Sequence, residues 1–165
     1  MAVKLLGIIF IVSACVLWGT GKSAKLRNSV TECDRTSRML ESISIMIRYN
    51  NYEITRILRE VSSEKNCPQY IRCASELMDN GIDFHLAWRE AVENSVADIS
   101  ERELMLRFGN ELGLSDTEGQ MKLIEGVLAE ISDIKAERAD SYKRYGRVYR
   151  SVGLLFGLMA GVIII

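Results

Sequence analysis

Residues 116–165 read DTEGQMKLIEGVLAEISDIKAERADSYKRYGRVYRSVGLLFGLMAGVIII and contain no proline. Apolar residues recur there at steps of three and four, the spacing of one face of an amphipathic helix, as in Met121, Ile124, Leu128 and Ile131. The pattern continues through Tyr142, Tyr145 and Tyr149 into an uncharged tail. The stretch therefore predicts one continuous helix, about 75 Å long at ~1.5 Å per residue.

A second long helix is predicted at the other end of the chain. Between Leu5 and Tyr49 the sequence contains no proline. From Leu26 onward the apolar residues again follow helical spacing, at Leu26, Val30, Cys33, Leu40, Ile43 and Ile47. Asn50 and Asn51 are then expected to turn the chain.

Short helices are predicted between the two long ones. The first is expected over residues 54–61, where Ile54, Ile57, Leu58 and Val61 share one face. Pro68 is expected to start the next, and Gly81 to end it with a left-handed cap. Asp83 can cap the one after that.

Two capping boxes mark the last two helices. Residues 100–103 read SERE and are expected to open a helix that Gly113 ends. Residues 115–118 read SDTE and are expected to open the long C-terminal helix. No strand is predicted. The fold class is all-α, an antiparallel six-helix bundle whose first and last helices extend into the membrane.

Both ends of the chain have the composition of membrane segments. Leu5–Gly21 and Ser151–Ile165 are 17 and 15 residues without a charge. As helices they would span about 26 and about 22 Å, short against a hydrocarbon core of roughly 30 Å. We expect transmembrane segments at 1–21 and 151–165 around a helical domain at 22–150. A signal peptide with a poor cleavage site and a lipoprotein box ending at Cys15 are disfavoured alternatives.

Basic residues flank the inner ends of both segments and set the expected orientation. They are Lys22, Lys25 and Arg27 after the first segment, and Arg138, Lys143, Arg144, Arg147 and Arg150 before the second. By the positive-inside rule residues 22–150 are cytoplasmic, which keeps their cysteines reduced.

Composition disfavours several functional classes. The 21 basic and 22 acidic residues leave a net charge of -1, which argues against nucleic-acid binding. Gly19–Ser23 resembles the end of a phosphate-binding loop, but Val16 stands where that loop needs glycine. Neither a cofactor nor an enzymatic function is expected.

Two kinds of ionisable residues are candidates for a chemical site. Cys67, Cys73 and His85 are three candidate metal ligands without an evident fourth, so no metal site is expected. The carboxylate pairs Glu101 with Glu103, and Glu130 with Asp133, are interpreted as solvated helix faces rather than acid–base pairs.

Two other features are candidate interaction sites. Gly153, Gly157 and Gly161 recur every four residues, which places them on one helix face where another membrane helix can approach. Asp116, Glu118 and Gln120 lie at the start of the long C-terminal helix. Asp116 and Gln120 are expected to face solvent or a partner, and the loop end with its acidic surroundings is expected to form part of a partner-binding surface.

Three stretches resemble the stage III sporulation protein AB family. They are the run LGLSDTEGQ at 112–120, the run YRSVGLLFGL at 149–158, and the pair Ala87–Trp88. The family is itself similar to the cytoplasmic domain of the type II secretion inner-membrane platform protein, a six-helix bundle. Residues 50–53, NNYE, depart from the glycine-threonine-proline-like turn expected there.

The resemblance implies a non-enzymatic platform subunit in the complex that joins mother cell and forespore, located in the mother-cell membrane facing the forespore. The implied partners are an ATPase like stage III sporulation protein AA and the other membrane subunits of the channel. Homo-oligomerisation is left open. The alternative is a membrane-tethered helical regulatory module that binds a small ligand, and an enzyme ranks third.

Overall fold

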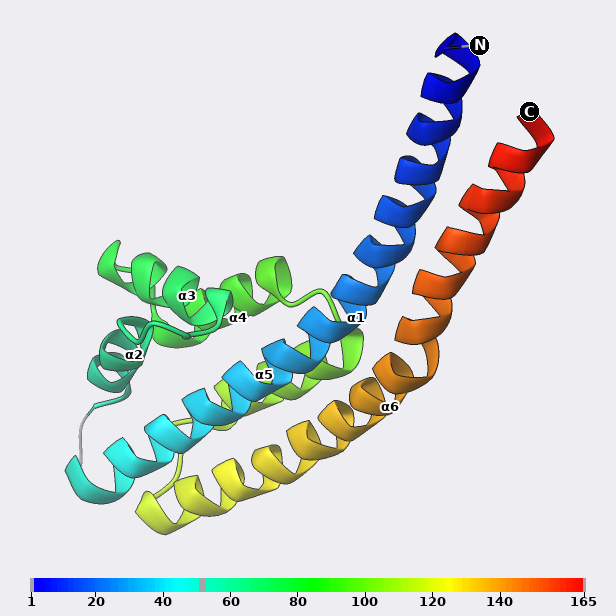
Figure 1. The fold of residues 1–165 in the computed structure, drawn as a ribbon. Coiled ribbons are helices and arrows are strands. Elements are labelled where there is room, and N and C mark those ends of the chain that lie inside the picture. Colours follow the sequence, from blue (N-terminus) through cyan, green and yellow to red (C-terminus); the bar gives the residue numbers. More distant parts are fainter. Residues whose placement is uncertain (1, 51–52, 165) are drawn as a thin grey trace. The chain divides into compact units, whose positions relative to one another are not determined.

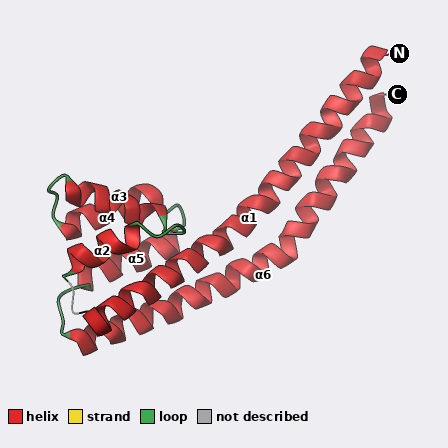
Figure 2. Cartoon of the chain, turned by 60° about the vertical axis from the view of Figure 1, so that its left-hand side comes forward, coloured by secondary structure: helices red, strands yellow, loops and turns green. Residues whose placement is uncertain are grey.

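The computed structural model describes residues 2–50 and 53–164, and all regular structure in these ranges is helical (Figure 1). The helices are α1 (Ala2–Asn50), α2 (Ile54–Ser62), α3 (Gln69–Asp79), α4 (Phe84–Ser95), α5 (Ile99–Glu111) and α6 (Thr117–Ile164). The predicted all-α class with six helices is confirmed, and so is the continuity of the two long ones (Figure 2).

The chain divides into two compact units. One is Glu32–Lys135, here called the bundle, which holds α2 to α5 together with the adjoining parts of α1 and α6. The other, here called the paired ends, holds the rest of the two long helices.

The bundle core is centred on Trp88 of α4. This side chain is 1% exposed, and its indole Nε1 donates to the carbonyl of Met105 at 2.7 Å. The rings of Tyr70, Phe84 and Phe108 lie around it at centroid distances of 5.6 to 5.8 Å. Such packed aromatic pairs add to the stabilisation from burial alone.

The two long helices contribute the expected apolar faces to this core. The buried residues are Cys33, Met39, Leu40 and Ile43 on α1, and Ile124, Val127 and Ile131 on α6. An ion pair between Lys135 Nζ and Asp34 Oδ1 at 2.6 Å joins the same two helices at the surface. The helical spacing of the sequence thus identified the buried face of each.

The turns confirm two of the predicted helix signals and correct a third. Gly81 follows α3 with a φ of 87°, and the Asp83 carboxylate accepts the backbone N–H of His85 at the start of α4. The capping box predicted at residues 100–103 is wrong. Asp98 is the N-cap of α5 and accepts the N–H of Glu101 at 3.1 Å, which places Ser100 inside the helix.

In the paired ends, α1 and α6 run side by side (Figure 1). Ser23 is buried, and a Cβ added to Gly146 would lie 3.3 Å from its Oγ, so the helices approach closely there. Arg138 Nη1 donates to the carbonyl of Ser29 at 3.1 Å. Within the described residues, no helix combines the length and apolarity that a membrane crossing needs.

Candidate functional site

The α5–α6 turn contains the residues predicted to bind a partner. Leu112 is buried, and Gly113 has a φ of 88°, a conformation that favours glycine. The predicted capping box at residues 115–118 is wrong, because Asp116 accepts the N–H of Gly119 at 3.0 Å and α6 begins at Thr117. Glu118 is instead paired with Lys122 at 2.7 Å.

Gln120 is buried beneath this turn, so the expectation that it faces solvent is wrong. Its side chain is 5% exposed. Its Oε1 accepts the backbone N–H of Gly113 at 3.1 Å, and its Nε2 donates to the Oγ of Ser115 at 3.0 Å. The amide thus takes both hydrogen-bonding roles and ties the turn to the first turn of α6.

The outer surface of the turn is acidic and apolar. Asp116 and Glu118 are exposed, and Leu114 is 74% exposed. A partner-binding role for Asp116 and Glu118 stays a prediction. Gln120 acts on such a surface only through the backbone that it holds.

A buried polar cluster inside the bundle was missed by the sequence analysis. Glu101 is 4% exposed, so its assignment to a solvated face is wrong. Tyr70 Oη donates to Thr36 Oγ1 at 3.4 Å, and Thr36 Oγ1 donates to Glu101 Oε1 at 3.0 Å. Burial raises the pKa of Tyr70 well above its usual range, so the phenol remains protonated, and a hydrogen-bond donor, even in alkaline solution. The cluster joins α1, α3 and α5.

The candidate metal ligands have other surroundings. His85 Nδ1 lies 2.9 Å from the carbonyl of Gly109. Burial raises the pKa of the Cys67 thiol to about 11, and this thiol contacts the carbonyl of Pro68. A protonated thiol is a poor nucleophile. Across the described residues, no three His, Cys, Asp or Glu side chains gather as a metal site.

The glycine face predicted for membrane helix packing lies within α6. Gly153, Gly157 and Gly161 are helical there, but the packing around them is not among the features that the structure describes. Their role in helix packing stays a prediction.

Taken together, the fold and its polar clusters define an all-helical protein in which one unit is a helical bundle and the other is formed by the paired ends of the first and last helices. The chain belongs to the stage III sporulation protein AB family, whose sequence profile matches residues 4–165.

Two other proteins are similar to this chain. Stage III sporulation protein AB of Bacillus subtilis (strain 168) is 26% identical over 167 residues, covering 94% of this chain and 95% of the relative. A solved structure of a stage III sporulation protein AB is similar in fold, with a TM-score of 0.55 and 20% identity, covering 68% of this chain and 94% of the other.

Proposed function

We propose that this protein is a non-enzymatic, membrane-anchored platform subunit of a sporulation complex. Its bundle faces the cytoplasm and couples an ATPase like stage III sporulation protein AA to the membrane channel. The uncharged stretches at 5–21 and 151–165 are the proposed anchors, on either side of a domain at 22–150.

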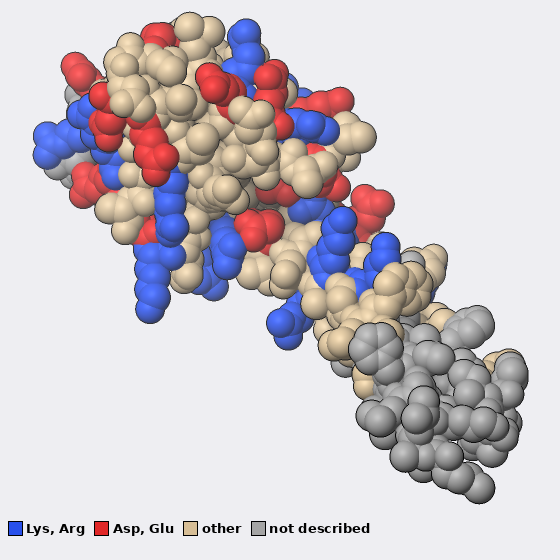
Figure 3. All heavy atoms as spheres, turned by 90° about the horizontal axis from the view of Figure 1, so that it is seen from above, with Lys and Arg blue, Asp and Glu red and all other residues tan. Residues whose placement is uncertain are grey.

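The observation that carries this proposal is the segregation of charge along the chain. Residues 1–31 and 136–165 together hold nine basic and two acidic side chains, a net charge of +7. Residues 32–135 hold 12 basic and 20 acidic side chains, a net charge of −8. Figure 3 shows several Lys and Arg side chains together on the described part of the paired ends. Cations beside apolar segments favour a cytoplasmic bundle above an anionic membrane surface.

The interior of the bundle gives little support to the alternative function, a regulatory module that binds a small ligand. Its core is filled by packed aromatic and aliphatic side chains. The hollow lined by Arg38 and Lys65 has a volume of about 170 Å³. Pockets for small organic ligands typically measure about 300–1,000 Å³.

Affinity purification of the full-length protein from sporulating membranes tests the proposal. We expect the ATPase to be recovered with it. Asp116→Asn with Glu118→Gln removes two charges while Asn keeps the helix cap, and should reduce recovery. Glu125→Gln with Asp133→Asn is the control, because it removes two charges at exposed positions elsewhere on α6. This variant should recover as much ATPase as the wild type. No ATPase with the wild type would refute the coupling role, whereas equal recovery from both variants would place the contact elsewhere.

Membrane topology is tested separately. A cysteine placed near Asp98, in a chain lacking its native cysteines, should resist an impermeant maleimide added to intact cells. Efficient labelling would show that the proposed orientation is wrong.

A further inference from the structure

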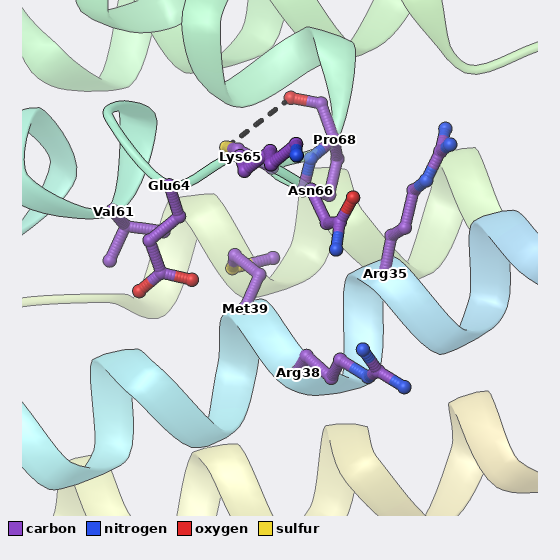
Figure 4. A pocket seen from close by; sticks show the side chains of 9 residues that line it. Arg35, Arg38, Met39, Val61, Glu64, Lys65, Asn66 and Pro68 are labelled. Atoms are coloured by element: carbon purple, nitrogen blue, oxygen red, sulfur yellow. Dashed lines mark hydrogen bonds between the residues drawn. The ribbon is translucent and has the colours of Figure 1, made fainter.

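A shallow hollow lies in the bundle between α1 and the loop that joins α2 to α3 (Figure 4). Its base is apolar, formed by Met39, Val61 and Pro68, all of which are buried. Its volume of about 170 Å³ is too small for a nucleotide or a typical organic cofactor. The hollow has room for side chains presented by a peptide.

The rim of the hollow is cationic and comes from two elements. Arg35 and Arg38 extend from α1, and Lys65 extends from the facing loop (Figure 4). Arg35 already binds a carboxylate, because its Nη1 lies 2.7 Å from Glu32 Oε1. Within the described part of the chain, Arg38 and Lys65 form no ion pair. Two charges therefore remain available to a ligand.

The rest of the rim adds a neutral amide and a carboxylate. Asn66 points its amide toward α1 and offers both a donor and an acceptor (Figure 4). Glu64 is the acidic residue of the lining. The lining thus contains three cationic side chains and one carboxylate. This local excess of positive charge contrasts with the net charge of −8 over residues 32–135. The surrounding negative charge disfavours an extended polyanion and leaves room for a local contact with one or two carboxylates.

We propose that this hollow binds an acidic segment of a partner protein. Carboxylates of the segment pair with Arg38 and Lys65, and an adjacent aliphatic group rests on Met39 and Val61. The inference rests on the proposed function, because the partner is taken to be another protein of the same complex. It adds a second contact surface on the bundle, formed by residues other than those of the α5–α6 turn.

Fluorescence anisotropy with the purified full-length protein tests the site. The probe is a short labelled peptide of alternating glutamate and leucine, and its twin carries glutamine at every glutamate. We expect the acidic peptide to bind and the twin to bind at least about tenfold more weakly, because charge-assisted contacts are lost. Arg38→Glu with Lys65→Glu should weaken binding of the acidic peptide by about tenfold or more.

Arg48→Glu with Arg89→Glu is the matched control, since it changes the net charge equally at two exposed sites. It should alter affinity by less than about twofold. Equal binding of the two peptides, no binding, or equal losses in both double variants would overturn the proposal. So would displacement of the peptide by inorganic phosphate but not by acetate at equal ionic strength, which would indicate a phosphate site. If the protein forms dimers and Arg38→Glu disrupts them, the occupant of the hollow is a second copy of this chain and not a partner protein.

Sporulation efficiency separates this inference from the platform role. If the wild type restores sporulation to a deletion strain and the Arg38→Glu, Lys65→Glu variant does so equally well, the hollow is not a required contact and the inference fails alone. If the wild type restores sporulation but no ATPase is purified with it, the coupling role fails and the peptide assay still decides the hollow.

Discussion

Replacing Gly109 with alanine tests how tightly α4 and α5 pack in the bundle. A Cβ on Gly109 would lie 2.7 Å from Trp88 Cγ and closer still to Cδ1 and Nε1 of the same ring. The indole has little room to move, because it is 1% exposed and its Nε1 is bonded to the Met105 carbonyl. The added methyl group therefore forces the two helices apart.

Two opposing effects decide the sign of this substitution. Alanine in place of a helical glycine stabilises by about 0.5–1 kcal/mol. Overpacking a filled core costs about 1–3 kcal/mol, and a clash with a rigid ring should fall in the upper half of that range. The net expectation for Gly109→Ala is a loss of about 1–2.5 kcal/mol in the free energy of unfolding. In a chain of this size that lowers Tm by roughly 2–10 °C.

Gly126→Ala is the matched control for this experiment. Gly126 lies inside α6, and nothing surrounds the position of an added Cβ within 4 Å. The same chemical change should there raise stability by about 0.5–1 kcal/mol. Thermal and urea unfolding of the detergent-solubilised full chain, followed by far-UV circular dichroism, measures both. If Gly109→Ala stabilised the protein as Gly126→Ala does, the close packing on Trp88 would be refuted.

Three further predictions use the same unfolding assay. Gln120→Ala should lower the free energy of unfolding by about 1–3 kcal/mol, because it leaves the Gly113 N–H without its acceptor. Glu118→Gln at the surface should change it by less than about 0.5 kcal/mol. Similar effects of the two substitutions would contradict the buried role of the Gln120 amide. Thr36→Val keeps the shape but removes a donor to the buried Glu101 carboxylate, so we expect a loss of about 1–2 kcal/mol, and a neutral result would argue against that contact. Stability should fall as pH rises from about 9 to about 11, because the Cys67 thiol ionises near 9 in the unfolded chain but only near 11 in the folded one, and the unfolded state then binds fewer protons. Cys67→Ala should reduce that fall by up to about 2 kcal/mol, and an unchanged slope would exclude this thiol as a source.

The helices and their buried faces were predictable because they depend on local spacing. The stripe of Ile124 and Ile131 repeats over many turns of α6, and tertiary packing reinforced it. Gly81 and Asp83 were also found correctly, since one adopts a conformation that favours glycine and the other has no competing cap nearby. Such signals are contained in a few adjacent residues.

Helix starts with competing caps were harder to predict. Asp98 lies two residues before Ser100, and Asp116 directly follows Ser115, so each start offers two good capping side chains. In both cases the aspartate is the cap. The choice depends on where the preceding loop leaves the backbone, and the loop before α5 is set by Val96, which is buried in an extended conformation.

The buried polar residues could not be identified from local patterns at all. Glu101 is in the core because Thr36, 65 positions away, presents a hydroxyl to it. The basic hollow likewise depends on α1 meeting a loop that begins after α2. Only the tertiary fold brings such groups together, and a charged or amide side chain on a helix otherwise indicates a solvent-exposed position.

The burial of Gln120 changes how the acidic turn can serve a partner. A turn held only by a surface cap would have to be ordered on binding, and that ordering would cost affinity. Here the Gln120 amide fixes Gly113 and Ser115, and Asp116 caps α6 directly. The exposed Leu114 and Glu118 therefore extend from a backbone that is already ordered. If a partner binds at this turn as proposed, Gln120 contributes by pre-organising the backbone, and the side chains that the partner contacts are the exposed ones around it.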